Sequence, residues 1–161
     1  MTLLSRKADY ALVILSYLYQ HKEGGNAHAI ATQFGLSHPF VANILKELCR
    51  AGFVTSRRGV KGGYALAPTA GTISLAELLE TVEDGFQLTL CNHTTHDDAC
   101  SHSAACTVKG PIAEVHQRLM GVLRGVTLAE LFDPKAKPSA LHELPVLAAG
   151  CCSTPVESSH A

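Results

Sequence analysis

Residues 35–66 read GLSHPFVANILKELCRAGFVTSRRGVKGGYAL. Between residues 38 and 50 the apolar side chains recur at helical spacing, which predicts a helix with one buried face. The members of that face are Val41, Ile44, Leu45 and Leu48. The glycine at position 35 can adopt a positive φ, and Ser37 can cap the helix that follows. A short helix over about residues 27–34 precedes this turn, so the pattern is that of a helix-turn-helix motif.

The opposite face of the 38–50 helix carries side chains that can contact DNA. His38 and Pro39 stand at its start, where recognition helices usually touch base edges. Further along, the outward positions are Asn43, Lys46 and Arg50. A plain helical hairpin with a solvated polar face has the same spacing, so this segment alone leaves both interpretations open.

A predicted β-hairpin follows the helix-turn-helix. Residues 53–56 and 64–66 are strand-like, and they bracket a glycine-rich tip with three cations. The cations are Arg57, Arg58 and Lys61. A wing beside a recognition helix needs such a tip, because it lies against phosphates or reaches into the minor groove. The combination predicts a winged helix-turn-helix DNA-binding domain over residues 1–70.

The charge of the chain is segregated by half. The 161 residues have a formal net charge of −1 at pH 7. Residues 1–70 hold eight Lys or Arg against three Asp or Glu, whereas residues 71–161 hold five against eleven. The first half is therefore electropositive, which suits a polyanion such as double-stranded DNA. An ordinary solvated surface would explain each charged residue by itself. It would not explain why positive and negative charges are segregated between the two halves of the chain.

The remaining elements are expected to be helical. An amphipathic helix runs from the N-terminus to about Gly24, and residues 74–77 form a capping box that opens a helix ending near Glu83. Residues 127–130 open a last short helical turn. Residues 133–161 are rich in Ala, Pro and Ser without periodicity, which predicts an unstructured tail.

Pro111 can start one more helix. Its apolar residues alternate three and four positions apart, the spacing of a narrow coiled-coil seam. They are Ile112, Val115, Leu119 and Val122. Packing on its own domain is one use of this seam, but winged helices normally bind two-fold sites as dimers, so we expect a dimerisation helix. The predicted fold class is mostly α with a small β-hairpin wing.

Three cysteines crowd into the sixteen residues from 91 to 106, namely Cys91, Cys100 and Cys106. The same stretch holds His93, His96, His102, Asp97 and Asp98. The longest largely apolar run, from Ala11 to Tyr19, has only nine residues, follows Asp9 and lacks a small-residue cleavage site. Neither a signal peptide nor a membrane span is therefore expected, and we expect a cytoplasmic protein. In a reducing cytosol such cysteines indicate metal or redox chemistry rather than disulfides.

The ligand chemistry is compatible with two kinds of metal site. Three thiolates from one loop suit an iron–sulfur cluster and leave one coordination position to be filled from elsewhere. The same thiolates with one of the loop histidines make a reasonable structural zinc site. However, gaps of eight and five residues between the cysteines differ from the short C-x₂₋₄-C pairs that most zinc sites show.

Four further groups of residues occur in an order that is characteristic of one family: Asp9-Tyr10-Ala11, Arg58-Gly59, Gly62-Gly63-Tyr64 and Val126-Thr127-Leu128. Together with the three cysteines, they resemble the Rrf2 family of bacterial winged-helix regulators, which includes iron–sulfur assembly regulators and a nitric-oxide sensor. The resemblance covers residues 1 to about 132.

The resemblance implies a homodimer built on the helix at 111–124, and an iron–sulfur cluster on Cys91, Cys100 and Cys106 whose state sets DNA affinity. Residues 71–132 would then form the cluster-binding loop and the dimerisation helix. Some members take an acidic fourth ligand from the first helix of the opposite subunit, and Asp9 has the matching context. Its alternative role is a favourable interaction with the helix macrodipole.

Another ligation pattern does not carry over. Some members have a histidine three residues after the last cysteine, where this chain has Lys109. The loop histidines therefore remain candidates for the fourth ligand. The gap of eight residues between Cys91 and Cys100 is also wider than in some members of the family. The cluster can therefore be of the [2Fe-2S] or the [4Fe-4S] type.

The expected function is a transcriptional regulator that senses iron, redox or nitric-oxide status, with iron–sulfur assembly genes as the first candidate targets. A zinc-stabilised winged-helix adaptor that binds protein is the alternative. A thiol enzyme using Cys100 or Cys106 is not expected, because no nucleophile elbow or oxyanion-hole motif is present. Cys49 is interpreted as small core filling, and Cys151 and Cys152 as spectator thiols in the tail.

Overall fold

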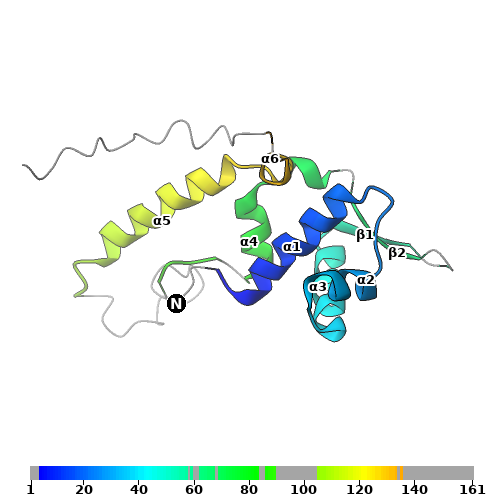
Figure 1. Ribbon diagram of the computed structural model, residues 1–161. Coiled ribbons are helices and arrows are strands. Elements are labelled where there is room, and N and C mark those ends of the chain that lie inside the picture. Colours follow the sequence, from blue (N-terminus) through cyan, green and yellow to red (C-terminus); the bar gives the residue numbers. More distant parts are fainter. Residues whose placement is uncertain are drawn as a thin grey trace, which may run out of the picture.

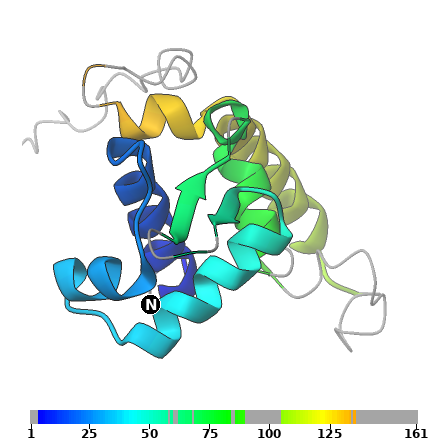
Figure 2. The ribbon, with the colours of Figure 1, turned by 90° about the vertical axis from the view of Figure 1, so that its right-hand side faces the viewer.

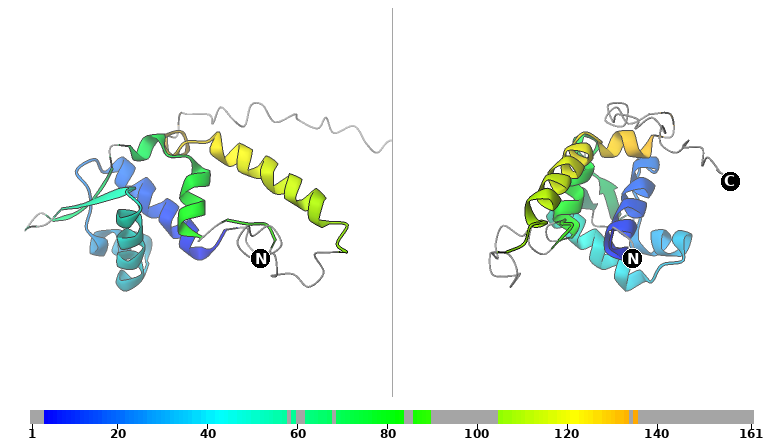
Figure 3. Two further views of the ribbon diagram at one scale, coloured as in Figure 1. Left: turned by 180° about the vertical axis from the view of Figure 1, so that it is seen from behind. Right: turned by 90° about the vertical axis from the view of Figure 1, so that its left-hand side faces the viewer.

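The computed structural model describes residues 4–57, 59, 62–67, 69–83, 86–89, 105–133 and 135. This part is mostly helical with one two-stranded antiparallel hairpin, as the sequence predicts. The elements are α1 (Arg6–Gln20), α2 (Ala27–Phe34), α3 (His38–Arg50), β1 (Val54–Arg57), β2 (Gly63–Leu66), η1 (Ala70–Thr72), α4 (Leu75–Val82), α5 (Lys109–Arg124) and α6 (Leu128–Phe132). The hairpin and α5 extend toward opposite ends of the molecule (Figures 1 and 3).

The core lies around α1, which packs against α3, α4 and the hairpin (Figure 2). Helix α1 begins at an N-cap, Ser5, whose side chain accepts a hydrogen bond from the Ala8 N–H. The largest fully buried side chains are aliphatic and include Ile14, Leu15, Leu18, Ile30, Leu45, Leu48, Leu78, Leu79 and Leu128. The first helix ends at Gln20, earlier than Gly24, because the glycines beyond it belong to a turn that pairs with the hairpin.

The helix-turn-helix forms with the predicted boundaries. Gly35 adopts φ 63° and closes α2, whose N-cap Asn26 accepts a hydrogen bond from Ala29. The predicted apolar face of α3 is fully buried, with Val41, Ile44, Leu45 and Leu48 at 3% exposure or less. One detail of the prediction is wrong: Ser37 occupies the N-cap position but makes no side-chain cap hydrogen bond.

The hairpin is joined to the turn between α1 and α2. The Gly25 N–H donates to the Tyr64 carbonyl at 2.8 Å, and the Tyr64 N–H donates to the Gly25 carbonyl at 2.7 Å. A Cβ on Gly24, where φ is +90°, would lie 2.5 Å from the Tyr64 oxygen. Only glycine can be accommodated at position 24, because the backbone there comes so close to Tyr64. The close contact and the two hydrogen bonds fix the hairpin to the rest of the domain.

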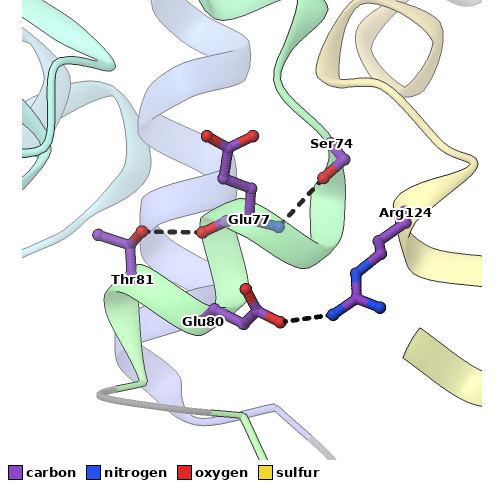
Figure 4. Close-up of polar contacts among 5 residues, drawn as sticks. All are labelled: Ser74, Glu77, Glu80, Thr81 and Arg124. Carbon is purple, nitrogen blue, oxygen red and sulfur yellow. Dashed lines mark hydrogen bonds and ion pairs between the residues drawn. The ribbon is translucent and has the colours of Figure 1, made fainter. Parts of the chain in front are cut away.

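The starts of α4 and α6 lie side by side. The Leu75 N–H donates to the Val126 carbonyl at 2.8 Å, and the Leu128 N–H donates to the Ile73 carbonyl at 2.9 Å. In Figure 4, the Ser74 hydroxyl accepts a hydrogen bond from the Glu77 N–H at 3.2 Å, the serine half of the predicted capping box. Both halves of such a box are present in α6, between Thr127 and Glu130.

Helix α5 begins at Lys109, so Pro111 is its third residue and not its first. The first turn has no intrahelical acceptors for its N–H groups, so proline is tolerated at this position as well. On one side of α5, Met120 is buried, and Leu119 and Leu123 pack against the core. Leu119 of the predicted seam thus belongs to contacts within the chain. An ion pair between Arg124 and Glu80 at 3.3 Å also joins α5 to α4 (Figure 4).

On the other side of α5, the valine side chains are exposed or only partly buried in the described part of the chain. Val108 and Val115 are 59% and 51% exposed, and Val122 is partly exposed. These valines recur every seven residues and form what we call the valine stripe. The predicted tail lies outside the described residues, apart from Asp133 and Lys135.

Candidate functional site

The outward face of α3 is accessible as the sequence predicts. His38, Pro39, Asn43, Lys46 and Arg50 are all exposed. Pro39 lies in the first turn, where its missing N–H leaves no bond unmade. The ring of His38 lies 6.0 Å from that of His28 on α2, between centroids.

A cleft of about 460 Å³ separates α3 from the hairpin. We call it the helix–wing cleft, and its lining residues are Ala42, Asn43, Lys46, Cys49, Arg50, Ser56 and Tyr64. Three of these were predicted to contact DNA, and the structure brings them together with Ser56 of β1 and Tyr64 of β2. Sequence reasoning missed these two, although their cross-strand pairing would have placed them on one face.

Cys49 was interpreted as core filling, and that interpretation is wrong. Its side chain is only partly buried, and it lines the helix–wing cleft. Position 49 lies at the border of the apolar face of α3, on the side that faces the helix–wing cleft.

The described cations of this surface are not neutralised. Lys46, Arg50 and Arg57 make no ion pair with any described residue, whereas Lys7 binds Glu47 at 2.8 Å. Glu47 is the only acidic residue of α3, so this ion pair neutralises the negative charge of that helix. The surface therefore presents uncompensated positive charge, which favours a polyanion. Arg58 and Lys61, predicted for the wing tip, lie outside the described residues.

The predicted metal ligands are only partly within the described chain. Cys91, Cys100 and the histidines His93, His96 and His102 lie outside the described residues. Cys106 is exposed and stands three residues before α5. Asp9 is exposed in the first turn of α1. Among the residues that the structure describes, no three His, Cys, Asp or Glu side chains gather closely enough to hold a metal ion.

Two buried polar atoms belong to residues on either side of the three cysteines in the sequence. Neither His116 Nδ1 on α5 nor Gln87 Oε1 has a hydrogen-bond partner among the described residues. The ring of His116 stacks on Phe86, with centroids 6.5 Å apart. Buried polar groups in proteins nearly always have a hydrogen-bond partner, so these two atoms are exceptions within the described part of the chain.

Two comparisons by sequence support one family. The model of the Rrf2 family, described as an iron-dependent transcriptional regulator, matches residues 4–134. The HTH-type transcriptional regulator NsrR of Geobacillus kaustophilus is 27% identical over 140 residues, which cover 86% of this chain and 95% of the relative. Protein aau3 of Rhizobium meliloti is 30% identical over 136 residues, covering 84% and 86%.

Solved structures have the same fold. IscR of T. potens is similar with a TM-score of 0.61 and 27% identity, covering 80% of this chain and 84% of that one. CymR, the global cysteine regulator of B. subtilis, gives a TM-score of 0.62 at 23% identity, covering 82% and 97%, a likeness of fold alone. No helix within the described ranges is long and apolar enough to cross a membrane. The chain belongs to the Rrf2 family of winged-helix, DNA-binding transcriptional regulators and is not an enzyme.

Proposed function

We propose that this regulator is a homodimer whose affinity for operator DNA depends on an iron–sulfur cluster held by Cys91, Cys100 and Cys106. The observation that carries the proposal is the exposed Cys106 thiol, three residues before the helix with the valine stripe. A ligand at this position can couple a cofactor to the dimer interface. The iron-dependent description of the family supports the same function, as do the similarities to NsrR and IscR.

The residues present fit such a cofactor. Thiolates are the preferred ligands of iron–sulfur clusters, and three of them are available in one loop. Gln87 precedes Cys91 by four residues and His116 follows Cys106 by ten, and each has a buried side-chain atom with no hydrogen-bond partner among the described residues. When bound there, a cluster supplies a redox-active group that iron supply, oxidants or nitric oxide can alter.

The dimer is proposed from the valine stripe. Val115 of α5 and its N-cap residue Val108 are more than half exposed, and Val122 is partly exposed. The three recur at heptad spacing along a helix whose other side packs on the core of its own chain. β-Branched residues at such positions favour a two-stranded helix pair. A second copy of α5 would cover these valines. In such a dimer the two wings would contact the two halves of a two-fold symmetric operator.

We assign the fourth ligand to Asp9 of the opposite subunit. The carboxylate is exposed in the first turn of α1 and has no ion-pair partner among the described residues. The same turn is tied to the end of α4, because the Ser5 N–H donates to Glu83 Oε1 at 3.0 Å. Ligation by Asp9 would therefore link the cysteine loop of one subunit to the DNA-binding domain of the other, and the spacing of the two wings would depend on it.

The test compares DNA affinity with and without the cofactor. Protein purified without oxygen and the same protein after cluster removal are titrated against an operator selected in vitro. We expect the affinities to differ by about fivefold or more, the usual size of an allosteric coupling. Equal affinities would refute the sensing role. Genes of iron–sulfur cluster assembly are the first promoters to test.

A further inference from the structure

We propose that the helix–wing cleft seats one phosphodiester of the DNA backbone, and that the hydroxyls of Tyr64 and Ser56 donate hydrogen bonds to it. The inference rests on DNA binding by the family and not on the cluster. The sequence predicted DNA contacts only from α3 and from the wing tip. The proposal adds two residues of the hairpin strands to this DNA-binding surface.

The two hydroxyls are placed together by the strand register. Ser56 of β1 pairs directly with Tyr64 of β2, so their side chains leave the hairpin on the same face. That face looks across the cleft toward Lys46 and Arg50 of α3. Neither hydroxyl makes a hydrogen bond with a described residue, so both remain available to a ligand.

The chemistry of the lining selects an anion. Two cations, two hydroxyls and the Asn43 amide can all donate hydrogen bonds, and no acid is among the lining residues. The acid of α3, Glu47, is held by Lys7 away from the cleft lining. Charge-assisted hydrogen bonds from such a set suit the oxygens of a phosphate.

The position of the cleft selects DNA as the source of that phosphate. On one side lies the helix expected in the major groove, and on the other the hairpin whose tip is expected in the minor groove. The backbone strand that separates two grooves must then pass between the elements. The cleft is the space that the structure leaves for it.

Tyr64 is also held in place before DNA arrives. Its backbone is hydrogen-bonded to Gly25 on one side and paired with β1 on the other, and its ring packs against the core. A hydroxyl fixed in this way loses little conformational entropy on binding. Tyr64 would therefore fix how α3 and the wing are placed along the DNA backbone.

The first experiment removes single hydroxyls. Tyr64→Phe keeps the ring, and we expect it to weaken binding to an operator and to a scrambled duplex alike by about tenfold, the size expected for a hydrogen bond to a charged group. The slope of log affinity against log salt should not change, because no charge is lost. Arg50→Gln should instead lower that slope by about 0.9.

Tyr19→Phe is the matched control, because Tyr19 packs on Phe132, with ring centroids 5.8 Å apart, and does not line the cleft. It should leave binding unchanged. Unchanged affinity for both Tyr64→Phe and Ser56→Ala would overturn the proposal.

The second experiment uses Cys49 as a reporter inside the cleft. The full chain is treated with iodoacetamide, and alkylation of the Cys49 peptide is followed by mass spectrometry with and without duplex DNA. We expect DNA to slow alkylation of Cys49 severalfold, and inorganic phosphate alone to have no effect. Equal rates with and without DNA would contradict the proposal, and protection by inorganic phosphate alone would show a free-anion site instead.

Discussion

The Ser5 backbone N–H donates a 3.0 Å hydrogen bond to Glu83 Oε1, so the residue that caps α1 is held by the residue that ends α4. These positions are 78 residues apart in the chain. The contact ties the first turn of α1, which contains Asp9, to the segment that leads into the cysteine loop. The first turn of α1 is therefore joined to Glu83, which precedes the first of the three cysteines by eight residues in the sequence.

Glu83→Ala should lower the free energy of unfolding by about 1 kcal/mol, because α1 loses an acceptor and a negative charge near its N-terminus. Glu83→Gln keeps an acceptor oxygen and should lose about half as much. Urea unfolding of the two variants measures the difference. Identical stability of Glu83→Ala and the parent chain would show that the contact contributes nothing.

Gly24→Ala should destabilise the chain more than Gly35→Ala. Both residues have positive φ, but only at Gly24 does an added Cβ meet a neighbour, the Tyr64 oxygen at 2.5 Å. We expect a loss of about 1 kcal/mol at Gly35 and about 3 kcal/mol at Gly24. Thermal or urea unfolding compares them, and equal losses would mean that the turn moves away from the wing without cost.

Asn43→Ala and Lys46→Ala should weaken DNA binding in different ways. The lysine offers only charge, so its loss should reduce affinity for an operator and a scrambled duplex similarly. The amide can read a base edge, so its loss should reduce discrimination at one base position by about 1–3 kcal/mol. Fluorescence anisotropy on both duplexes separates the two. Similar losses on both duplexes for Asn43→Ala would refute its readout role.

Val115→Glu should convert the proposed dimer to a folded monomer, because it places a charge in the middle of the valine stripe. Gln117→Glu, at an exposed position of the same helix, is the control and should remain dimeric. Light scattering after gel filtration gives the masses. A Val115→Glu variant with the same mass as its control would place the dimer interface elsewhere.

The fold was predictable where local chemistry determines it. Gly35 ends α2 with a positive φ as predicted, and the buried face of α3 follows from the spacing of its aliphatic residues. The start of α5 was misplaced because proline is compatible with any position in a first helical turn, so Pro111 does not mark the first residue.

Contacts between distant segments were not predictable. The pairings of Gly25 with Tyr64 and of Ser74 with Thr127 depend on how helices pack, which no local pattern reports. The hairpin register places Ser56 beside Tyr64, but the packing of the hairpin against α3 decides that they line the helix–wing cleft together with Cys49. The metal site remains a prediction, because Cys91 and Cys100 lie outside the described residues.

The central claim is that the three cysteines hold an iron–sulfur cluster. Iron, zinc and acid-labile sulfide should be measured in protein purified without oxygen, together with its absorption spectrum. We predict a brown protein that contains iron and sulfide, and loss of its charge-transfer absorption in Cys106→Ala but not in Cys49→Ala. A colourless protein with stoichiometric zinc would contradict the claim and support a zinc-stabilised adaptor.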